Sequence, residues 1–249
     1  MANQFPLRLV GSRMLAPSVR HLDFARDDGL PLDFVPGQFI QVHFSNPDGT
    51  PTKRSYSLAT IHDHALGPGE SVQIAVSYVP GGAATALFAA LDEGQQIQAS
   101  GPYGRFVLHP SDANRRYLLI GTGTGVTPYR AMLPQLAEMM EKRGVEVVLL
   151  FGARSPAELI YSDDFYAFAE KHANFRFVPC FSRELPERPH PDVRRGYVQE
   201  ALAEFAPSAE GDIAYLCGNP NMVDTAFEAL KGYGLPVPHI RREKYVSSK

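Results

Sequence analysis

Residues 118–133 read LLIGTGTGVTPYRAML, and this segment constrains the fold more than any other part of the chain. Its apolar start predicts a buried strand, and Pro128 lies where a helix would begin, because the fixed φ of proline suits the first helical turn. Glycines between a strand and a helix let the backbone approach a ligand closely, and the N–H groups of the helix's first turn attract negative oxygens. The segment therefore predicts a strand, a turn and a helix that together bind a pyrophosphate.

The spacing of the glycines leaves an alternative open. Gly121, Gly123 and Gly125 are two residues apart, which is not the G-x-G-x-x-G spacing of the common dinucleotide fingerprint. A tight turn between a strand and a helix, without a ligand, has the same local pattern. The residues further along the chain must distinguish the two interpretations.

The chain has two halves with different patterns of hydrophobicity. In residues 1–110, short apolar runs are separated by turn residues, which is typical of an antiparallel barrel or sandwich. In residues 111–249, apolar runs alternate with helical patterns, which indicates a parallel sheet covered by helices. The predicted strands are 39–44, 72–79, 96–99, 117–120, 145–151, 175–181 and 213–217, and the predicted helices are 86–91, 129–142, 163–172, 198–205 and 222–231. We therefore predict two domains, 1–110 and 111–249.

The composition is that of an ordinary soluble globular protein. Hydrophobic residues make up 44% of the chain and charged residues 20%, which is enough apolar material for real cores. The net charge of −3 gives no sign of nucleic-acid binding, and no apolar stretch has the length of a membrane span. The N-terminus lacks the pattern of a signal peptide, so we expect a cytoplasmic protein without a nucleic-acid or membrane partner.

The cysteines and histidines do not predict a metal site. The two cysteines, Cys180 and Cys217, each end an apolar run, and two thiols alone cannot build a four-cysteine iron–sulfur centre. His62 and His64 lie in a polar stretch, and we assign them to a solvated loop. Redox chemistry in this chain would therefore need a different cofactor.

Arginines follow the predicted strands where a common NAD site has a carboxylate. Guanidinium groups bind a phosphate dianion through paired hydrogen bonds, and a tyrosine ring offers a flat face to an adenine. The pattern favours NADP(H) over NAD(H), although a single arginine is more commonly a solvated surface charge. The residues concerned are Arg154, Ser182, Arg183, Arg194, Arg195 and Tyr197.

The stretch KRSYSLAT, residues 53–60, offers groups that suit a flavin. On a strand, Arg54 and Tyr56 share one face, and Ser55 and Ser57 lie on the other face or at the end of the strand. A guanidinium, a flat ring and a hydroxyl suit a phosphate, an isoalloxazine and a ring nitrogen. Exposed strands also commonly alternate polar and aromatic residues, so this stretch is ambiguous alone.

A second glycine-led helix start lies in the first half of the chain. Gly81 and Gly82 precede the helical pattern at 86–91, which predicts a second anion site by the same physics as the first. One pyrophosphate site in each half predicts two bound dinucleotides.

With these residues, the chain resembles the ferredoxin–NADP(+) reductase family of flavoproteins, and within it the bacterial ferredoxin/flavodoxin reductases. The resemblance covers nearly the whole chain and rests on five motifs in order. These are the flavin motif at Arg54, Tyr56 and Ser57, the FAD pyrophosphate motif at Gly82 and Thr85, the NADP loop at Gly121, Thr122, Gly123, Thr124 and Gly125, the 2′-phosphate motif at Ser182, Arg183, Arg195 and Tyr197, and the nicotinamide motif at Cys217 and Gly218.

The resemblance implies an N-terminal antiparallel β-barrel that binds FAD and a C-terminal α/β parallel-sheet domain that binds NADP(H). In the first domain, we expect Val76, Tyr78, Ala83 and Ala84 to complete the FAD site. In the second, we expect Arg154 to contribute to the NADP site.

The end of the chain departs from the commonest family pattern. Many relatives stop at an aromatic residue that stacks on the flavin, whereas here Tyr245 is followed by residues 246–249. By resemblance, we expect Tyr245 to stack on the flavin and Glu243 to lie near the nicotinamide. The alternative is that this end of the chain is a disordered tail.

The family's activity is electron exchange between NADP(H) and a ferredoxin or flavodoxin. Nicotinamide exchanges a hydride, the protein carrier takes single electrons, and a flavin with three redox levels connects the two. We expect Ser57 to bond to flavin N5, Tyr56 and Tyr245 to stack on the two faces of the ring, and Tyr245 to move aside for the nicotinamide. Cys217 is expected beside the nicotinamide, and an inert buried thiol is the alternative.

The protein partner is expected to be an acidic ferredoxin or flavodoxin that docks on a basic rim, and no motif demands an oligomer, so we expect a monomer. The reductase component of an oxygenase, a free flavin or ferric reductase, and a non-catalytic NADP(H) sensor are the alternatives. The rim residues are Arg13, Arg20, Arg105, Arg241, Arg242 and Lys244.

Overall fold

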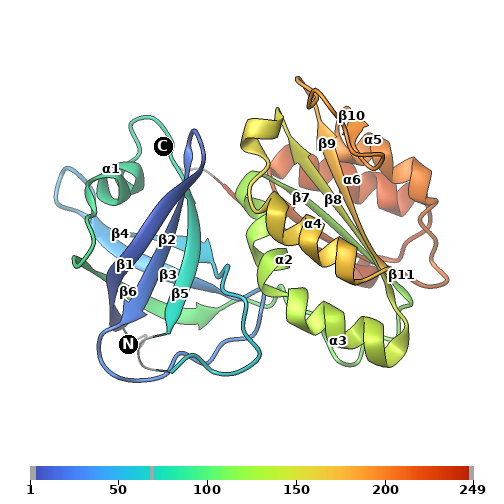
Figure 1. Ribbon diagram of the computed structural model, residues 1–249. Helices are drawn as coiled ribbons and strands as arrows, with labels where there is room; N and C mark the ends of the chain where they lie inside the picture. The colour runs from blue at the N-terminus through green and yellow to red at the C-terminus, as the bar shows by residue number, and fades with distance from the viewer. Residues whose placement is uncertain (1–3, 68–69, 247–249) are drawn as a thin grey trace. The chain divides into compact units, whose positions relative to one another are not determined.

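The computed structural model describes residues 4–67 and 70–246 (Figure 1). Contacts divide the chain into two compact units. The first unit holds the described residues up to Leu108 together with Thr127–Pro134, and the second holds His109–Val126 and Gln135–Val246. Each unit has a six-stranded sheet of its own.

The sheet of the first unit is antiparallel and closes into a barrel. Its order is β4-β3-β6-β1-β2-β5, and Leu58, which follows β4, forms a bridge with Ile74 of β5. The Ala59 N–H also donates to the Gln73 carbonyl at 2.8 Å, so the two edge strands are joined. The strands are β1 (Gln4–Ala16), β2 (Val19–Arg26), β3 (Phe39–Ser45), β4 (Pro51–Ser57), β5 (Ser71–Ser77) and β6 (Gln96–Tyr103).

Alternating side chains of these strands fill the barrel. Leu7 and Leu9 of β1 and Ile40 and Val42 of β3 are fully buried in one cluster, as the two-residue period of a strand requires. Helix α1 (Ala83–Ala90) connects β5 with β6 and adds Phe88 to the same cluster. The core of the first unit is therefore shared by the barrel and this short helix.

The sheet of the second unit is parallel throughout. Its order is β10-β9-β8-β7-β11-β12, so the chain moves outward from β7 to β10 and then returns to the other side of β7. The order reverses between β7 and β11, and in such sheets ligands bind beyond the carboxyl ends of the strands at the reversal. The strands are β7 (Arg116–Thr122), β8 (Glu146–Ala153), β9 (Phe175–Phe181), β10 (Arg194–Arg195), β11 (Asp212–Gly218) and β12 (Ile240–Lys244).

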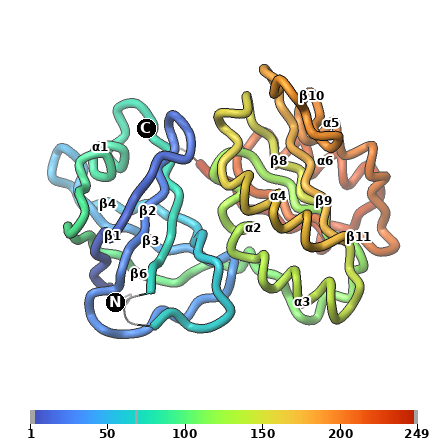
Figure 2. Tube along the Cα trace, viewed as in Figure 1, coloured from blue at the N-terminus to red at the C-terminus, as the bar shows by residue number. Residues whose placement is uncertain are grey.

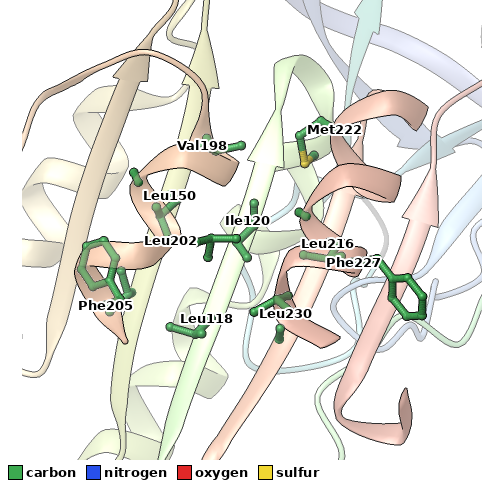
Figure 3. Close-up of a cluster of buried hydrophobic side chains, with 14 of the residues drawn as sticks. Leu118, Ile120, Leu150, Val198, Leu202, Phe205, Leu216, Met222, Phe227 and Leu230 are labelled. Carbon is green, nitrogen blue, oxygen red and sulfur yellow. The ribbon is translucent and has the colours of Figure 1, made fainter. Parts of the chain in front are cut away.

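Helices cover both faces of the parallel sheet. On one face, α5 (Val198–Ala201), the 3₁₀ turn Leu202–Phe205 and α6 (Pro220–Gly232) pack against Leu118, Leu150 and Leu216 (Figure 3). On the other face, Phe165 of α4 (Ser162–Lys171) contacts Phe177 of β9, with ring centroids 5.3 Å apart. The predicted fold, an antiparallel barrel followed by a parallel α/β domain, is confirmed.

One predicted helix is two helices in the structure. The prediction of one helix over 129–142 is wrong, because α2 (Thr127–Ala131) and α3 (Leu133–Arg143) are separate (Figure 2). Pro134 has no N–H to donate to the Arg130 carbonyl, and its ring would clash with that carbonyl in a continuous helix. The predicted helix 198–205 likewise consists of α5 and a 3₁₀ turn.

Candidate functional site

The glycine-rich loop after β7 packs tightly against the end of β11. A Cβ atom at Gly125 would lie 2.3 Å from the Cys217 carbonyl oxygen, and one at Gly218 would lie 2.6 Å from the Thr122 carbonyl oxygen. Gly218 also has a φ of +125°, which side chains disfavour. The Thr122 hydroxyl accepts from the Asn219 N–H at 3.0 Å. Gly125 and Gly218 thus serve the contact between loop and strand, on the two sides of the sheet reversal.

Gly123 has a different part in the loop. Its φ is +54°, and a Cβ atom there would have no heavy atom within 4 Å. Gly123 starts the 3₁₀ turn Gly123–Val126, which joins β7 to α2. The turn needs glycine at this position for its backbone conformation, and its surroundings are open.

Parallel pairing brings the predicted nicotinamide-side residues together. Cys217 of β11 is the register partner of Glu243 of β12, and the Tyr245 N–H donates to the Gly218 carbonyl at 2.8 Å. The Cys217 side chain is fully buried, and this burial raises the pKa of its thiol well above the usual value, with the nearby Glu243 charge acting in the same direction. The thiol is therefore protonated at neutral pH.

The predicted 2′-phosphate residues gather at the ends of β8, β9 and β10. The Ser182 N–H donates to the Ala153 carbonyl at 3.1 Å and the Arg183 N–H to the Arg154 carbonyl at 3.0 Å. β10 pairs Arg195 with Phe181 of β9, whose carbonyl also accepts from the Gly196 N–H at 2.9 Å. Tyr197 follows with 58% of its surface exposed.

The arginines of this corner differ in what they contact. The Arg154 guanidinium forms an ion pair with Glu158, Nε to Oε2 at 2.7 Å, and this contact holds the pKa of the Glu158 carboxyl below its usual value. Arg194 forms an ion pair with Glu204 at 2.7 Å. The side chains of Arg183 and Arg195 are exposed. Arg183 and Arg195 are thus the more accessible of these guanidinium groups to a phosphate.

In the first unit, β4 alternates as expected from Arg54 to Tyr56, and Ser57 is the last residue of the strand. Arg54 and Tyr56 are half-buried and Ser55 is exposed, whereas Ser57 is buried. The Tyr56 ring meets the Phe88 ring edge-on, with centroids 5.3 Å apart and an interplanar angle of 86°. Burial raises the pKa of Tyr56 to about 12, so its hydroxyl stays protonated.

Helix α1 begins after a glycine turn, with Gly81 at a φ of +75° and Gly82 as the extended N-cap residue. The Thr85 hydroxyl accepts from the Val79 N–H at 2.8 Å, which secures the entry to the helix. The N–H groups of its first turn therefore point out of a glycine turn, as a pyrophosphate site requires.

The other predicted FAD residues surround this helix. Ala83 and Ala84 form its first turn and are half-buried. The Tyr78 hydroxyl donates to the Phe88 carbonyl at 3.4 Å. Val76 is buried in the barrel core.

Several residues of the predicted basic rim have internal partners. Arg20 donates to the carbonyls of Phe88 and Leu91, Arg241 forms an ion pair with Asp112 at 2.6 Å, and Lys244 forms one with Asp224 at 2.7 Å. The Arg242 guanidinium lies 3.8 Å from the centre of the Phe227 ring. Arg13 and Arg105 are exposed. The positive charges can be predicted from the sequence, but the carbonyl and carboxylate groups that they contact cannot.

The histidine loop and the end of the chain are partly described. His64 contacts Asp63 at 2.7 Å and Glu70 at 2.9 Å, and no group of three or more His, Cys, Asp or Glu within 4–67 and 70–246 is arranged to hold a metal ion. In the same part of the chain, no helix has the length and apolar character to cross a membrane. Of the predicted tail, Val246 is exposed and residues 247–249 lie outside the described residues.

Arg130 of α2 is a buried residue that the sequence interpretation missed. Only 8% of its surface is exposed, and its Nη1 donates to the Ala59 carbonyl at 2.6 Å and to Gln73 Oε1 at 2.8 Å. The sequence does carry a signal for this burial. Arg130 lies in a short segment of otherwise apolar and small residues, which is typical of a buried segment and not of a solvated surface. Arg130 ties α2 to the residues that close the barrel.

Two family models match the chain. The model described as "Oxidoreductase FAD-binding domain" matches residues 6–108, and "Oxidoreductase NAD-binding domain" matches residues 119–228. These matches correspond to the barrel and to most of the parallel sheet.

Known proteins resemble the chain along most of its length. Ferredoxin–NADP reductase B of Sorangium cellulosum is 35% identical, and the alignment covers 98% of both chains. The reductase subunit of an aromatic O-demethylase from Amycolatopsis is 36% identical over 90% of this chain and 66% of its own length. The phenol hydroxylase P5 protein of Acinetobacter pittii is 31% identical over all of this chain and 67% of its own length.

Solved structures show the same fold. An Amycolatopsis cytochrome P450 reductase superposes with a TM-score of 0.82 at 32% identity, over 98% of this chain and 71% of its own. A ferredoxin NADP+ reductase from Neisseria gonorrhoeae, determined with FAD and NADP, has a TM-score of 0.82 at 22% identity, over 98% and 99%. The chain belongs to the ferredoxin–NADP(+) reductase family of FAD- and NAD(P)-binding oxidoreductases.

Proposed function

We propose that this protein is a ferredoxin–NADP(+) reductase, which exchanges electrons between NADP(H) and a separate ferredoxin or flavodoxin through FAD. The observation that carries the proposal is the 35% identity to a ferredoxin–NADP reductase along 98% of both chains. The 249 residues contain two cysteines, both buried, so they do not supply the four thiolates of an iron–sulfur cluster. A monomeric, cytoplasmic enzyme is part of the proposal, and sedimentation and cell fractionation test those two points.

The first domain, proposed as 1–110, fits FAD. The first turn of α1 offers backbone N–H groups to the pyrophosphate, and Arg54 supplies a guanidinium on the same face of β4 as Tyr56. The proposed FAD residues are Arg54, Tyr56, Ser57, Val76, Tyr78, Gly82, Ala83, Ala84, Thr85 and Tyr245.

The second domain, proposed as 111–249, fits NADP(H). The loop at 121–125 leaves β7 at the sheet reversal, where a pyrophosphate is expected. Exposed Arg183 and Arg195 would bind the 2′-phosphate and exposed Tyr197 would stack on the adenine. The remaining proposed residues are Thr122, Thr124, Arg154, Ser182, Cys217 and Gly218.

When bound, FAD supplies the chemistry that converts a hydride into two single electrons. The protein orients the reactants and excludes water. Ser57 is proposed to donate its hydroxyl to flavin N5, and Tyr56, protonated at neutral pH, to stack on the ring. Cys217, whose thiol is neutral, and its register partner Glu243 are proposed to lie beside the nicotinamide, and Tyr245 is proposed to act as a gate.

The experiment is the visible spectrum of the purified protein, followed on addition of each pyridine nucleotide. A yellow protein that bleaches rapidly with NADPH, slowly with NADH, and then reduces ferredoxin or flavodoxin supports the proposal. A colourless preparation that FAD does not reconstitute contradicts it. Faster reduction of free flavin than of either carrier protein also contradicts it.

Ser57→Ala separates chemistry from binding. Removing a hydroxyl at flavin N5 should slow flavin reduction by NADPH at least tenfold in stopped-flow measurements, with the NADPH Kd changed less than twofold. Ser55→Ala is the matched control, because Ser55 is exposed on the same strand. Equal effects of Ser57→Ala on rate and on binding would remove the proposed role.

A second candidate function is that of the reductase component of an oxygenase. The relative from Amycolatopsis, a reductase subunit of an aromatic O-demethylase, is 36% identical over 90% of the chain. That function predicts electron delivery to an oxygenase component at a rate that ferredoxin and flavodoxin do not match. Comparing the three acceptors at equal concentration distinguishes the two functions.

A further inference from the structure

The C-terminal end of α1 is held by an arginine from the barrel. The helix sequence AATALFAA contains no charged residue, and the last carbonyls of any helix lack partners within the helix. Arg20 of β2 donates from Nη1 to the Phe88 carbonyl at 2.5 Å and from Nη2 to the Leu91 carbonyl at 3.2 Å. Its positive charge also lies at the negative end of the helix dipole, where it is stabilising.

Arg20 is in turn fixed by the barrel. Its Nη2 donates to the Ser12 hydroxyl of β1 at 2.7 Å, and its backbone is the register partner of Val76 in β5. A guanidinium with contacts on two sides has little rotamer freedom. Arg20, a half-buried side chain, is therefore one of the contacts that fix the position of α1 on the barrel.

Phe88 connects this contact to the face that carries Tyr56. The Phe88 carbonyl accepts from Arg20 and from the Tyr78 hydroxyl, and the Phe88 ring is fully buried with its contact to the Tyr56 ring at 5.3 Å. The same eight-residue helix begins at the glycine turn that ends in Gly82. A shift of α1 would thus move its first turn and the packing of Tyr56 together.

We propose that Arg20 is a positioning residue for the FAD site. It holds α1 so that the first-turn N–H groups and the Tyr56 ring keep the arrangement that binds the flavin nucleotide. A helix of eight residues is not stable alone, so its orientation comes from such tertiary contacts. This inference rests on the proposed function, and it assigns Arg20 to the cofactor site instead of to a docking rim.

Arg20→Gln tests the inference, with Arg13→Gln as the matched control. Arg13 lies on the same β1–β2 hairpin and is exposed. FAD Kd is measured by titrating each apoprotein and following flavin fluorescence, and visible circular dichroism is recorded at saturating FAD. We expect Arg20→Gln to raise the FAD Kd at least tenfold and to change the flavin dichroism, and Arg13→Gln to stay within twofold of the wild type.

Thermal unfolding of the apoproteins distinguishes positioning from a general loss of stability. An Arg20→Gln protein with the wild-type FAD Kd overturns the inference. So does a raised Kd that accompanies unchanged flavin dichroism and a lower apoprotein Tm. If Arg20→Gln does not fold, Ser12→Ala replaces it, because it frees the guanidinium without removing it. Ser12→Ala must then raise the FAD Kd several-fold, and an unchanged Kd overturns the inference.

The outcome is distinguishable from failure of the proposed function. A wild-type protein that binds no FAD contradicts the proposed function itself. A wild-type protein that binds FAD but does not reduce a ferredoxin or flavodoxin contradicts the proposed activity and leaves the comparison of Kd values valid.

Discussion

At the scale of single residues, glycines in one motif have different physical tasks. Gly125 removes a clash with the Cys217 carbonyl, whereas Gly123 allows a φ of +54° in open surroundings. From the sequence alone, both glycines are interpreted as allowing the close approach of a ligand. The structure assigns Gly125 to close contact with the neighbouring strand β11.

Gly125→Ala should therefore destabilise the protein more than Gly123→Ala. The new methyl group would meet backbone atoms at 2.3 and 2.6 Å, which cannot move away as a side chain does. We expect a loss of about 3 kcal/mol in the free energy of unfolding for Gly125→Ala, and about 1 kcal/mol for Gly123→Ala, where only the left-handed backbone is penalised. Urea unfolding of both variants measures the difference, and equal losses would contradict it.

The buried Cys217 thiol predicts a pH dependence of stability. Its folded pKa is raised, so above the ordinary thiol pKa of about 8.5 the native state keeps a proton that the unfolded state releases. The contribution of this thiol to the free energy of unfolding is therefore fully present below about pH 8.5. It falls as the pH rises further, by at most about 1.4 kcal/mol per pH unit.

Urea unfolding of the wild type and of Cys217→Ala between pH 7.5 and about 10 tests this sign. The wild type should lose stability with pH more steeply than the variant, whatever the variant's stability at neutral pH. Parallel curves would show that the thiol ionises equally in both states.

At the scale of elements, the short helix α2 is connected to the barrel residues Ala59 and Gln73 by the side chain of Arg130. It has five residues, and its Arg130 donates to the Ala59 carbonyl and to Gln73 from a nearly buried position. Gln73 in turn donates to Asp23 at 2.8 Å. The hydrogen bonds of this arginine replace those that water would make, so its removal leaves buried acceptors unsatisfied.

Arg130→Met should lower the free energy of unfolding by about 2–3 kcal/mol, because methionine has a similar volume but no donors. Arg143→Met is the control, since Arg143 is exposed and donates to the Asn114 carbonyl at the end of α3. The Arg143→Met variant should lose less than about 1 kcal/mol in the free energy of unfolding. Guanidinium unfolding followed by circular dichroism gives both values, and similar losses would show that Arg130 is not specially placed.

At the scale of the whole molecule, we expect nucleotide selectivity to depend on which arginines already have a carboxylate partner. Arg154 contacts Glu158 and Arg194 contacts Glu204, whereas Arg183 and Arg195 are exposed. The sequence shows four arginines of equal standing. The ion pairs separate them into two that already have a carboxylate partner and two, Arg183 and Arg195, that we expect to contribute more to selecting a 2′-phosphate.

Arg183→Ala and Arg195→Ala should each lower the ratio of kcat/KM for NADPH to that for NADH at least tenfold, because a charge-assisted hydrogen bond to the 2′-phosphate contributes about 1.5–3 kcal/mol. Arg194→Ala is the control, and it should leave the ratio within twofold. Steady-state reduction of an artificial acceptor with both nucleotides measures the three ratios. A larger effect of Arg194→Ala than of the other two variants would reverse the assignment.

Much of the architecture was predictable because it depends on local patterns. Continuous apolar runs mark the buried strands β7, β8, β9 and β11, and strand–helix alternation predicts a parallel sheet. The pattern did not single out β1 and β2, since β2 carries the buried His21 within it and β1 shifts register after Leu9. The break before Pro134 was readable from the rules for proline but was overlooked.

By itself, the sequence determined the alternation of strands and helices in the second half of the chain, the two glycine-led turns and the family, because each depends on residues that are neighbours along the chain. Only the tertiary structure decided that Arg20 caps α1, that Arg130 contacts the residues that close the barrel and that Arg241 pairs with Asp112. The sequence does not reveal whether a charged side chain is solvated, donates to a carbonyl or forms an ion pair with a carboxylate. The partner of such a side chain is set by long-range pairing, which brings together residues that are 68 and 71 positions apart for the first two contacts.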